Sequence, residues 1–183
     1  MQIQIIALLA LGLLIFGCAG ASVSLPKTFP LFDCDSMQKT IEKSCDVQLT
    51  KMNWSGNSFC GFASNDQKFE YYFNGRPIEP YYNSTADLKK VLDGEKNTYE
   101  ELDLKDGAVY LNATPSSSNP TREFRLYIFY GNYDYSISTY SHPGPADDSH
   151  CVSKAGDLRL VELLGSELFT NKTVTYAEQM PHR

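Results

Sequence analysis

Hydrophobic and polar residues alternate along several short stretches of the chain, a pattern typical of β-strands with one buried face. The clearest stretches cover residues 122–130 and 133–141, and the pair Gly131-Asn132 between them favours a tight hairpin turn. Further strands are predicted at residues 58–63, 68–73, 99–104, 108–112 and 158–164. The 12 Tyr and 10 Phe residues also favour strands over helices.

Two segments follow a helical pattern instead. The first is predicted to begin at Asp35 or Ser36, either of which can act as the N-cap, and to continue to about Met52. Its apolar side is formed by Met37, Ile41 and Val47. The second covers residues 85–92 and ends at Gly94. One amino-terminal helix packed on a twisted antiparallel sheet gives an α+β fold.

The two hairpin strands each predict one apolar and one polar face. In the first strand, the two faces are formed by Phe124, Leu126, Ile128 and Tyr130, and by Glu123, Arg125, Tyr127 and Phe129. In the second strand, Tyr135, Ile137 and Thr139 oppose Ser136, Ser138, Tyr140 and His142. Because successive side chains point to opposite sides of a strand, we expect the helix on the apolar face and the titratable groups on the other.

The beginning of the chain predicts a signal peptide over residues 1–21. An apolar run from Ile5 to Phe16 is followed by Ala19-Gly20-Ala21, small residues typical of a cleavage site. The run is shorter than the roughly 20 apolar residues that cross a bilayer, so we expect a secreted protein with no membrane attachment after cleavage. The alternative is a bacterial lipoprotein acylated at Cys18, but the N-x-S/T triplets favour a eukaryotic secretory route.

The remaining chain is predicted to divide into an extended arm (residues 22–33), one domain (34–155) and a carboxy-terminal extension (156–183). About 160 residues are enough for a single domain with a sizeable core. The net charge of −6 argues against tight, salt-driven binding to a nucleic-acid backbone. An enzyme that contacts one phosphate at a time is still compatible with this charge.

The cysteines predict disulfides. Removal of the signal peptide leaves an even number of them, namely Cys34, Cys45, Cys60 and Cys151. In an exported chain these predict two disulfides, and three pairings are open. The N-x-S/T triplets provide candidate glycosylation sites at Asn53, Asn83, Asn112 and Asn171.

Three candidate catalytic residues belong to separate strand-like segments. Glu100, Arg125 and His142 supply a carboxylate, a guanidinium and an imidazole. Such a set cleaves RNA with no metal or other cofactor. The carboxylate takes the proton of a ribose 2′-hydroxyl, the guanidinium stabilises the phosphoryl oxygens, and the imidazolium protonates the departing 5′-oxygen, which leaves a 2′,3′-cyclic phosphate.

These residues belong to a longer series of spaced motifs. The series consists of Pro80-Tyr81-Tyr82-Asn83, Tyr99-Glu100, Gly107-Ala108-Val109-Tyr110, a strand with Arg125, and then His142, Gly144 and Cys151. It resembles the fungal guanyl-preferring ribonucleases, in which similar motifs follow one another at similar distances. The likeness extends over roughly residues 34–151.

The resemblance implies a microbial-ribonuclease-like fold that acts on single-stranded RNA. Glu100 would be the general base, Arg125 the phosphate stabiliser and His142 the general acid. Tyr99 would help to hold the phosphate. The implied base-binding residues are Tyr81, Tyr82 and Asn83. The implied disulfides are Cys34–Cys151 and Cys45–Cys60.

Other features favour a descendant of this family that no longer cleaves. Tyr81 stands where the family has a second His, and Asp87 is the nearest carboxylate to the place of the guanine-reading Glu. The triplet Phe32-Asp33-Cys34 is similar to the motif that opens the ribonuclease-like effectors secreted by powdery mildews. The alternative to an active endoribonuclease is therefore a secreted effector that binds host RNA or a host protein.

The choice of general base stays open between two neighbours. Spacing to Gly107 favours Glu100, whereas strand alternation, with Leu102 and Leu104 facing the core, favours Glu101. We prefer Glu100.

Two further hypotheses concern a metal site and a different class of protein. A metal site could be built from His142, Asp147, Asp148 and His150, but carboxylates in a Pro- and Gly-rich loop are typical of solvated turns, so we predict no metal. The third functional hypothesis is a secreted ligand-binding β protein. It needs a closed barrel with an apolar interior, whereas the predicted sheet has a polar face.

Overall fold

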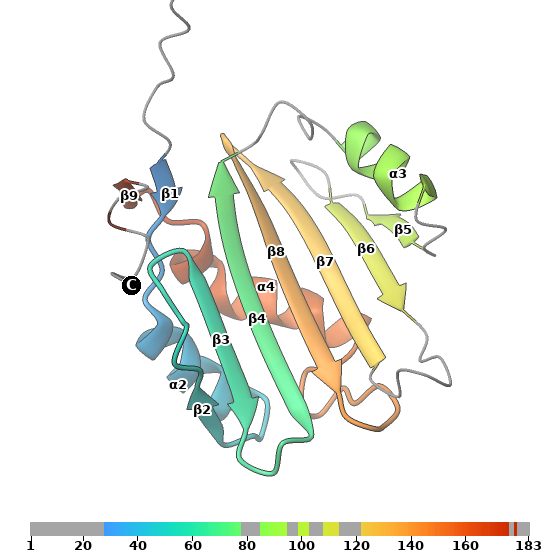
Figure 1. Ribbon diagram of the computed structural model, residues 1–183. Helices are drawn as coiled ribbons and strands as arrows, with labels where there is room; N and C mark the ends of the chain where they lie inside the picture. The colour runs from blue at the N-terminus through green and yellow to red at the C-terminus, as the bar shows by residue number, and fades with distance from the viewer. Residues whose placement is uncertain are drawn as a thin grey trace, which may run out of the picture.

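The computed structural model describes residues 28–77, 85–94, 99–102, 108–113, 122–175 and 178 (Figure 1). These residues form an α+β fold with three helices and two β-sheets, which confirms the predicted fold class at this level. The helices are α2 (Cys34–Ser44), α3 (Thr85–Gly94) and α4 (Lys154–Leu168). The strands are β1 (Thr28–Pro30), β2 (Leu49–Lys51), β3 (Phe59–Ser64), β4 (Phe69–Pro77), β5 (Tyr99–Leu102), β6 (Ala108–Ala113), β7 (Arg122–Tyr130), β8 (Tyr133–Ser141) and β9 (Thr173–Thr175).

Seven strands form one antiparallel sheet in the order β2-β3-β4-β8-β7-β6-β5, and β1 pairs with β9 in a separate ribbon. The two halves of the chain meet where β4 pairs with β8 over nine residues, from Phe69↔Ser141 to Pro77↔Tyr133. Among the described residues, the edge strands β2 and β5 do not pair with each other, so the sheet is open rather than a closed barrel. The hairpin between β7 and β8 is confirmed, and Gly131 in its turn adopts a φ of 59°.

Helices α2 and α4 cover one face of this sheet (Figure 1). The other face carries neither helix, and we call it the open face. Buried apolar side chains fill the space between the helices and the sheet, among them Met37, Ile41, Phe62, Phe73, Leu126, Ile137 and Leu160. This layer is the core, and it positions the strands whose alternate residues reach the open face.

Helix α2 is shorter than the sequence suggested. Its N-cap is Asp33, whose carboxylate accepts a hydrogen bond of 3.0 Å from the backbone N–H of Ser36. The predicted caps, Asp35 and Ser36, lie two and three residues later and are therefore wrong. The predicted end near Met52 is also wrong, because Asp46 adopts a left-handed φ of 46° and turns the chain into β2.

Side chains of α2 satisfy the outer edge of β2. The amide of Gln38 donates to the backbone oxygen of Leu49 at 2.9 Å, and the carboxylate of Glu42 accepts from the backbone N–H of Leu49 at 2.9 Å. These contacts occupy hydrogen-bonding groups that an edge strand would otherwise offer to another chain.

The strand predicted at residues 158–164 is wrong, because this segment belongs to α4. Ser153 caps the helix by accepting from the backbone N–H of Gly156 at 2.9 Å. Leu160, Leu164 and Leu168 recur every four residues and are fully buried or nearly so. The helix begins before the predicted boundary at residue 155, and these leucines belong to the same core as the sheet.

The cysteines form two disulfides, as predicted, but the pairing implied by the resemblance is wrong. Cys34 is bonded to Cys60, and Cys45 is bonded to Cys151. The reason is the position of α2, which carries Cys34 at its first turn and Cys45 just beyond its last. Its first turn lies next to β3, and its end lies next to the loop before α4. The disulfides thus fasten both ends of α2 to other parts of the core.

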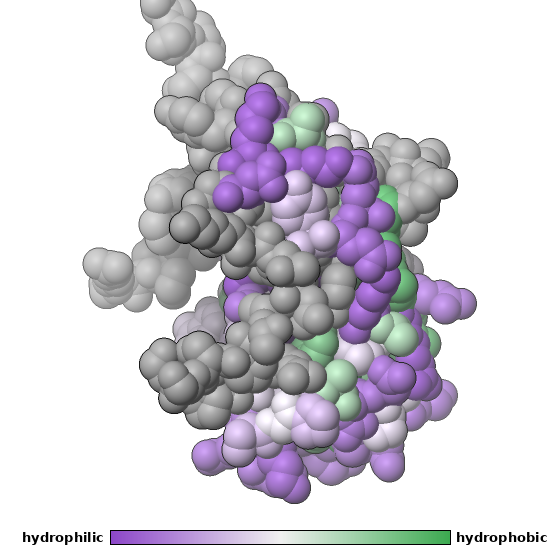
Figure 2. Space-filling view, turned by 90° about the vertical axis from the view of Figure 1, so that its right-hand side faces the viewer, coloured by the Kyte–Doolittle hydropathy of each residue, from purple (hydrophilic) through white to green (hydrophobic). Residues whose placement is uncertain are grey.

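Helix α3 confirms the second predicted helix and lies beside β5, at the edge of the sheet (Figure 1). Lys89 forms an ion pair with Glu101, and the hydroxyl of Tyr99 donates to Asp93 at 3.0 Å. Figure 2 shows this side of the molecule, where hydrophilic residues predominate among the coloured ones.

Several predictions lie outside the described residues. These are the signal peptide (1–21), most of the arm (22–27), and the base-binding residues Tyr81, Tyr82 and Asn83. Within the predicted arm, Thr28–Pro30 form β1. In the part of the chain that the structure describes, no helix is both long and apolar enough to span a membrane.

Candidate functional site

A groove of about 580 Å³ lies on the open face of the sheet. Its floor consists of alternate residues of β4, β7 and β8, and Trp54 and Phe59 line it as well. The floor residues are Glu70, Tyr72, Asn74, Arg76, Arg125, Tyr127, Ser136, Ser138, Tyr140 and His142. It therefore combines a carboxylate, two guanidiniums, an imidazole and several aromatic rings.

Glu70 and His142 form the acid–base pair of the groove. Nε2 of His142 lies 3.5 Å from Oε2 of Glu70, and both side chains are about 30% exposed. The hydroxyl of Tyr72 donates to the same carboxylate oxygen at 2.5 Å. Burial raises the pKa of the Tyr72 hydroxyl, and the neighbouring Glu70 raises it further. Tyr72 therefore remains a hydrogen-bond donor that orients the carboxylate.

Arg125 is held rigidly in the middle of the groove. Its Nε donates to Ser138 at 3.0 Å, and Nη1 donates to the hydroxyl of Tyr127 at 2.9 Å. Nη2 donates to Tyr140 at 3.3 Å and forms an ion pair with Glu123. Burial alone would lower the pKa of this guanidinium, but its contacts with Tyr127 and Glu123 outweigh burial and raise it. Arg125 therefore stays charged.

Tyr140 connects the guanidinium to the imidazole. Its hydroxyl accepts from Arg125 and donates to Glu123 at 3.0 Å, while its ring stacks on His142 at 6.2 Å and 7°. Burial raises the pKa of Tyr140, and the charge of Glu123 adds to this effect. Tyr140 thus contacts Arg125 through its hydroxyl and His142 through its ring.

A second guanidinium lies at the far end of the groove. The Nε and Nη2 atoms of Arg76 both lie 2.7 Å from Oδ2 of Asp134. The Asp134 side chain is only 5% exposed, and its burial raises its pKa although Arg76 opposes this. The pair anchors the end of β4 to β8.

The structure brings two of the three predicted catalytic residues together. Arg125 and His142 share the groove, but Glu100 points to the opposite face of the sheet. The register explains this, because Glu100 pairs through Tyr110 with Leu126, a core residue of β7. Its carboxylate lies 2.5 Å from Nζ of Lys154 at the start of α4.

The neighbouring residues Tyr99 and Glu101 follow the other parity and lie on the open-face side. Glu101 pairs through Val109 with Tyr127, and Tyr99 pairs through Leu111 with Arg125. Both side chains instead contact α3, Glu101 through Lys89 and Tyr99 through Asp93. The groove lining contains neither of them.

The carboxylate of the groove is Glu70, which the sequence interpretation missed. The signal was present in the alternation of β4, where Glu70, Tyr72 and Asn74 are polar or amphipathic and the residues between them are buried. The strand was predicted, but its pairing with β8 brings Glu70 to His142 across 72 residues of sequence, a separation that periodicity cannot bridge.

The loop with Asp147, Asp148 and His150 lies elsewhere. His150 Nδ1 lies 2.8 Å from Asp147, and its ring stacks on Phe69 at 4.7 Å. Hydrogen bonds lower the pKa of Asp147 to about 2. The bond from Ser149 has the largest effect, and the bonds from His150 add to it. Within the described ranges, no group of three or more His, Cys, Asp or Glu side chains is arranged to hold a metal ion.

Another hollow, of about 590 Å³, lies beside the first turn of α2. Its Lys51 and Asp35 form an ion pair, and its lining contains no histidine. It offers no acid–base pair like that of the open-face groove, which is therefore the stronger candidate site.

No protein-family profile matches this chain, and no curated protein is similar enough to count as a relative. The class that the structure defines is thus a disulfide-bonded α+β protein with an open polar groove on the uncovered face of its sheet.

Proposed function

We propose that this protein is a secreted ribonuclease-like protein that cleaves single-stranded RNA in the open-face groove, without a metal, through a 2′,3′-cyclic phosphate. The observation that carries the proposal is the contact of 3.5 Å between Glu70 and His142 in the groove that also holds Arg125. A carboxylate, an imidazole and a guanidinium on one face are the groups that this reaction needs.

Each group has a role that its surroundings support. Glu70, oriented by Tyr72, takes the proton of the 2′-hydroxyl as that oxygen attacks phosphorus. Arg125 stabilises the charge on the phosphoryl oxygens. His142 gives a proton to the 5′-oxygen as the bond from phosphorus to that oxygen breaks. Glu70 replaces Glu100 in the role of base, because Glu100 lies on the other face.

The resemblance to guanyl-preferring ribonucleases supports this proposal in part. The strands β5, β6, β7 and β8 follow one another in sequence and in the sheet, and the matched Arg125 and His142 share the groove. The same proposal includes secretion and delivery into a host. It also includes a base-binding role for Tyr81, Tyr82 and Asn83. The disulfides are compatible with an oxidising, extracellular environment.

A second candidate is an effector of the same fold that binds host RNA or a host protein and does not cleave. Both groove guanidiniums are already paired with carboxylates, Arg125 with Glu123 and Arg76 with Asp134. A substrate phosphate must compete with these partners, which weakens transition-state stabilisation. The third hypothesis, a ligand carrier, needs a closed barrel, and the open sheet of the described residues does not support it.

The deciding experiment is a cleavage assay of the purified, oxidised protein on single-stranded RNA. It is run from about pH 4 to 8, where carboxyl and imidazole groups titrate, with EDTA present to remove metal-dependent nucleases. We expect cyclic-phosphate ends, and we expect Glu70→Gln to lower kcat/KM by about 10²- to 10⁴-fold. No cleavage by a folded wild-type protein would favour the binding effector. Full activity of Glu70→Gln would remove Glu70 from the mechanism.

A further inference from the structure

Trp54, the single tryptophan of the chain, lines the groove and is unusually exposed. It is 55% exposed, and Tyr130 at 42% is the one other large hydrophobic side chain that the described ranges leave exposed. Tyr130 is on the opposite face of the sheet, where its ring packs against Phe169 at 4.9 Å. Trp54 thus presents an indole to the mouth of the groove.

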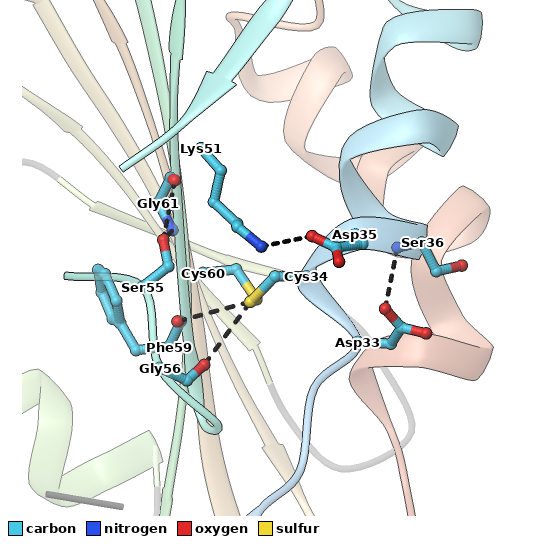
Figure 3. Close-up of a disulfide and its surroundings, with 10 residues drawn as sticks. All are labelled: Asp33, Cys34, Asp35, Ser36, Lys51, Ser55, Gly56, Phe59, Cys60 and Gly61. Carbon is cyan, nitrogen blue, oxygen red and sulfur yellow. Dashed lines mark hydrogen bonds and ion pairs between the residues drawn. A yellow bond between two sulfur atoms is a disulfide. The ribbon is translucent and has the colours of Figure 1, made fainter. Parts of the chain in front are cut away.

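The backbone beneath the indole is held in place by Gly61 of β3 (Figure 3). The Ser55 hydroxyl accepts from the Gly61 N–H at 3.0 Å and donates to the Gly61 oxygen at 3.1 Å. The N–H of Met52 donates to the same oxygen at 2.9 Å. A Cβ on residue 61 would lie 3.1 Å from both the Met52 sulfur and the Trp54 ring, so glycine allows this close approach.

The adjacent disulfide adds a second anchor (Figure 3). Sγ of Cys34 lies 3.6 Å from the oxygen of Gly56 and 3.7 Å from that of Phe59. A disulfide sulfur carries no proton, so these are packing contacts. Because Cys34 is bonded to Cys60, the loop that follows Trp54 packs against a disulfide that joins α2 to β3.

Two rings support the indole from within the groove. Phe59 stacks on Trp54 at 4.6 Å and 28°, and Tyr72 stacks on it at 5.6 Å and 15°. Tyr72 is also the residue that orients Glu70. A rigid, backed and half-exposed indole is pre-organised to stack on another flat ring, because little conformational entropy is lost when it does so.

We propose that Trp54 is a stacking subsite for a nucleobase of single-stranded RNA. The proposal rests on the proposed function of the groove. The net charge of −6 provides little general attraction for phosphates, so affinity must come largely from elsewhere. Stacking on an aromatic ring supplies affinity that tolerates any base, since every base has a π-face.

The sheet register places this subsite within reach of the catalytic groups. Tyr72 pairs with Ser138, and Ser138 pairs with Arg125. Strands lie roughly 4.8 Å apart, so the backbones at Tyr72 and Arg125 are about 10 Å apart. A base stacked on Trp54 and a phosphate at Arg125 therefore belong to the same or neighbouring nucleotides.

The test uses the fluorescence of this one tryptophan. The probe is a single-stranded 2′-O-methyl hexanucleotide, which lacks the attacking hydroxyl and so cannot be cleaved. We expect saturable quenching of the indole and protection from iodide in the wild-type protein. Inorganic polyphosphate, which has charge without bases, should leave the fluorescence unchanged.

Matched variants extend the test to affinity. Trp54→Ala should weaken binding of a labelled hexanucleotide at least about fivefold, whereas Trp54→Phe should retain most of the affinity. Tyr130→Ala, the exposed aromatic residue of the other face, should bind like wild type. All proteins carry Asn53→Gln, which removes the neighbouring glycosylation motif as a source of interference.

The outcomes separate this inference from the proposed function. Quenching without cleavage would support the subsite and overturn the ribonuclease. Normal cleavage with no quenching, and with equal binding by wild type and Trp54→Ala, would overturn the subsite and leave the ribonuclease. Neither binding nor cleavage by the folded protein would overturn both.

Discussion

The two faces of the central sheet are built from alternate residues of the same strands, yet they follow opposite rules. On the helix-covered face, β8 contributes Tyr135 and Ile137, which are buried to within 1%. On the open face the same strand contributes Ser138 and Tyr140 to a hydrogen-bonded groove, and His142 follows directly after its end. Because the two sets never share a side chain, a substitution on one face can alter stability or chemistry separately.

Among the described residues, each face contains one buried carboxyl group. The core holds Asp157, which is fully buried and accepts a hydrogen bond of 2.9 Å from Thr139. The open face holds Asp134, which is nearly buried but neutralised by Arg76. A buried carboxyl with a cationic partner keeps its charge at lower cost than one without. The comparison therefore predicts that Asp157 limits stability more than Asp134 does, because Arg76 offsets part of the cost of burying Asp134.

The largest expected effect belongs to the open face. We expect His142→Ala to lower the cleavage rate by about 10²- to 10⁴-fold without loss of fold, because the imidazole is the proposed general acid and lies just beyond the end of β8. The measurement is kcat on single-stranded RNA, with circular dichroism to check the fold. His150→Ala is the matched control, since His150 lies outside the groove, and it should cleave normally. Normal cleavage by His142→Ala would disprove the assignment.

The next effect belongs to the core. Ile137 is fully buried on the other side of β8, and Ile137→Ala should lower the free energy of unfolding by about 2–5 kcal/mol. Urea unfolding of the oxidised protein measures this change. Ser136→Ala, on the open face of the same strand, should change it by no more than about 0.5 kcal/mol. Equal losses in the two variants would contradict the division between the faces.

The sequence could predict features that depend on local periodicity. Alternation along residues 122–141 placed Arg125 and His142 on one face because a strand repeats every two residues, whatever it pairs with. The same reasoning could have found Glu70, which shares a face with Tyr72 in the predicted strand at 68–73. It could not show that β4 pairs with β8, because that pairing joins distant segments.

The errors of prediction have related causes. Leu158, Leu160 and Leu164 fit a period of two, which is compatible with the predicted strand at residues 158–164. Leu160 and Leu164 also share a helical face, and that pattern prevails in the core. Parity over four residues of β5 decides between Glu100 and Glu101, and the spacing argument preferred the wrong parity. Disulfide pairing depends on where α2 lies, and spacing does not contain that information.

Substitution of Asp157 should raise the free energy of unfolding, whereas substitution of an ordinary core residue lowers it. Burial raises the pKa of its carboxyl well above 3.8, so the folded state retains a proton that the unfolded state releases. Its contribution to stability is therefore fully present below about pH 4 and falls as the pH rises toward the folded-state pKa. Asp157→Asn has the same shape and no charge, and should raise the free energy of unfolding near pH 7, because no proton then has to be retained on folding.

Urea unfolding at several pH values tests this prediction. The advantage of Asp157→Asn should shrink to near zero at about pH 4, where the wild-type carboxyl is neutral in both states. Asp66→Asn is a useful control, because hydrogen bonds from Ser64 and Lys68 lower the pKa of Asp66 to about 2. That variant should be the less stable protein at neutral pH. An Asp157→Asn advantage independent of pH would contradict a buried proton.

The smallest expected effect concerns the two carboxylates of β5, which sit on opposite faces of one strand. Glu100 pairs with Lys154 and Glu101 with Lys89, and both glutamates are at least half exposed. Exposed ion pairs contribute about 0–1 kcal/mol, and neither carboxylate reaches the groove. Glu100→Gln and Glu101→Gln should therefore each change the cleavage rate by no more than about twofold. Assayed beside Glu70→Gln, these variants show which face of the sheet supplies the base. A large loss of activity in Glu100→Gln would mean that Glu100 reaches the open face in solution and has the role that the resemblance implies.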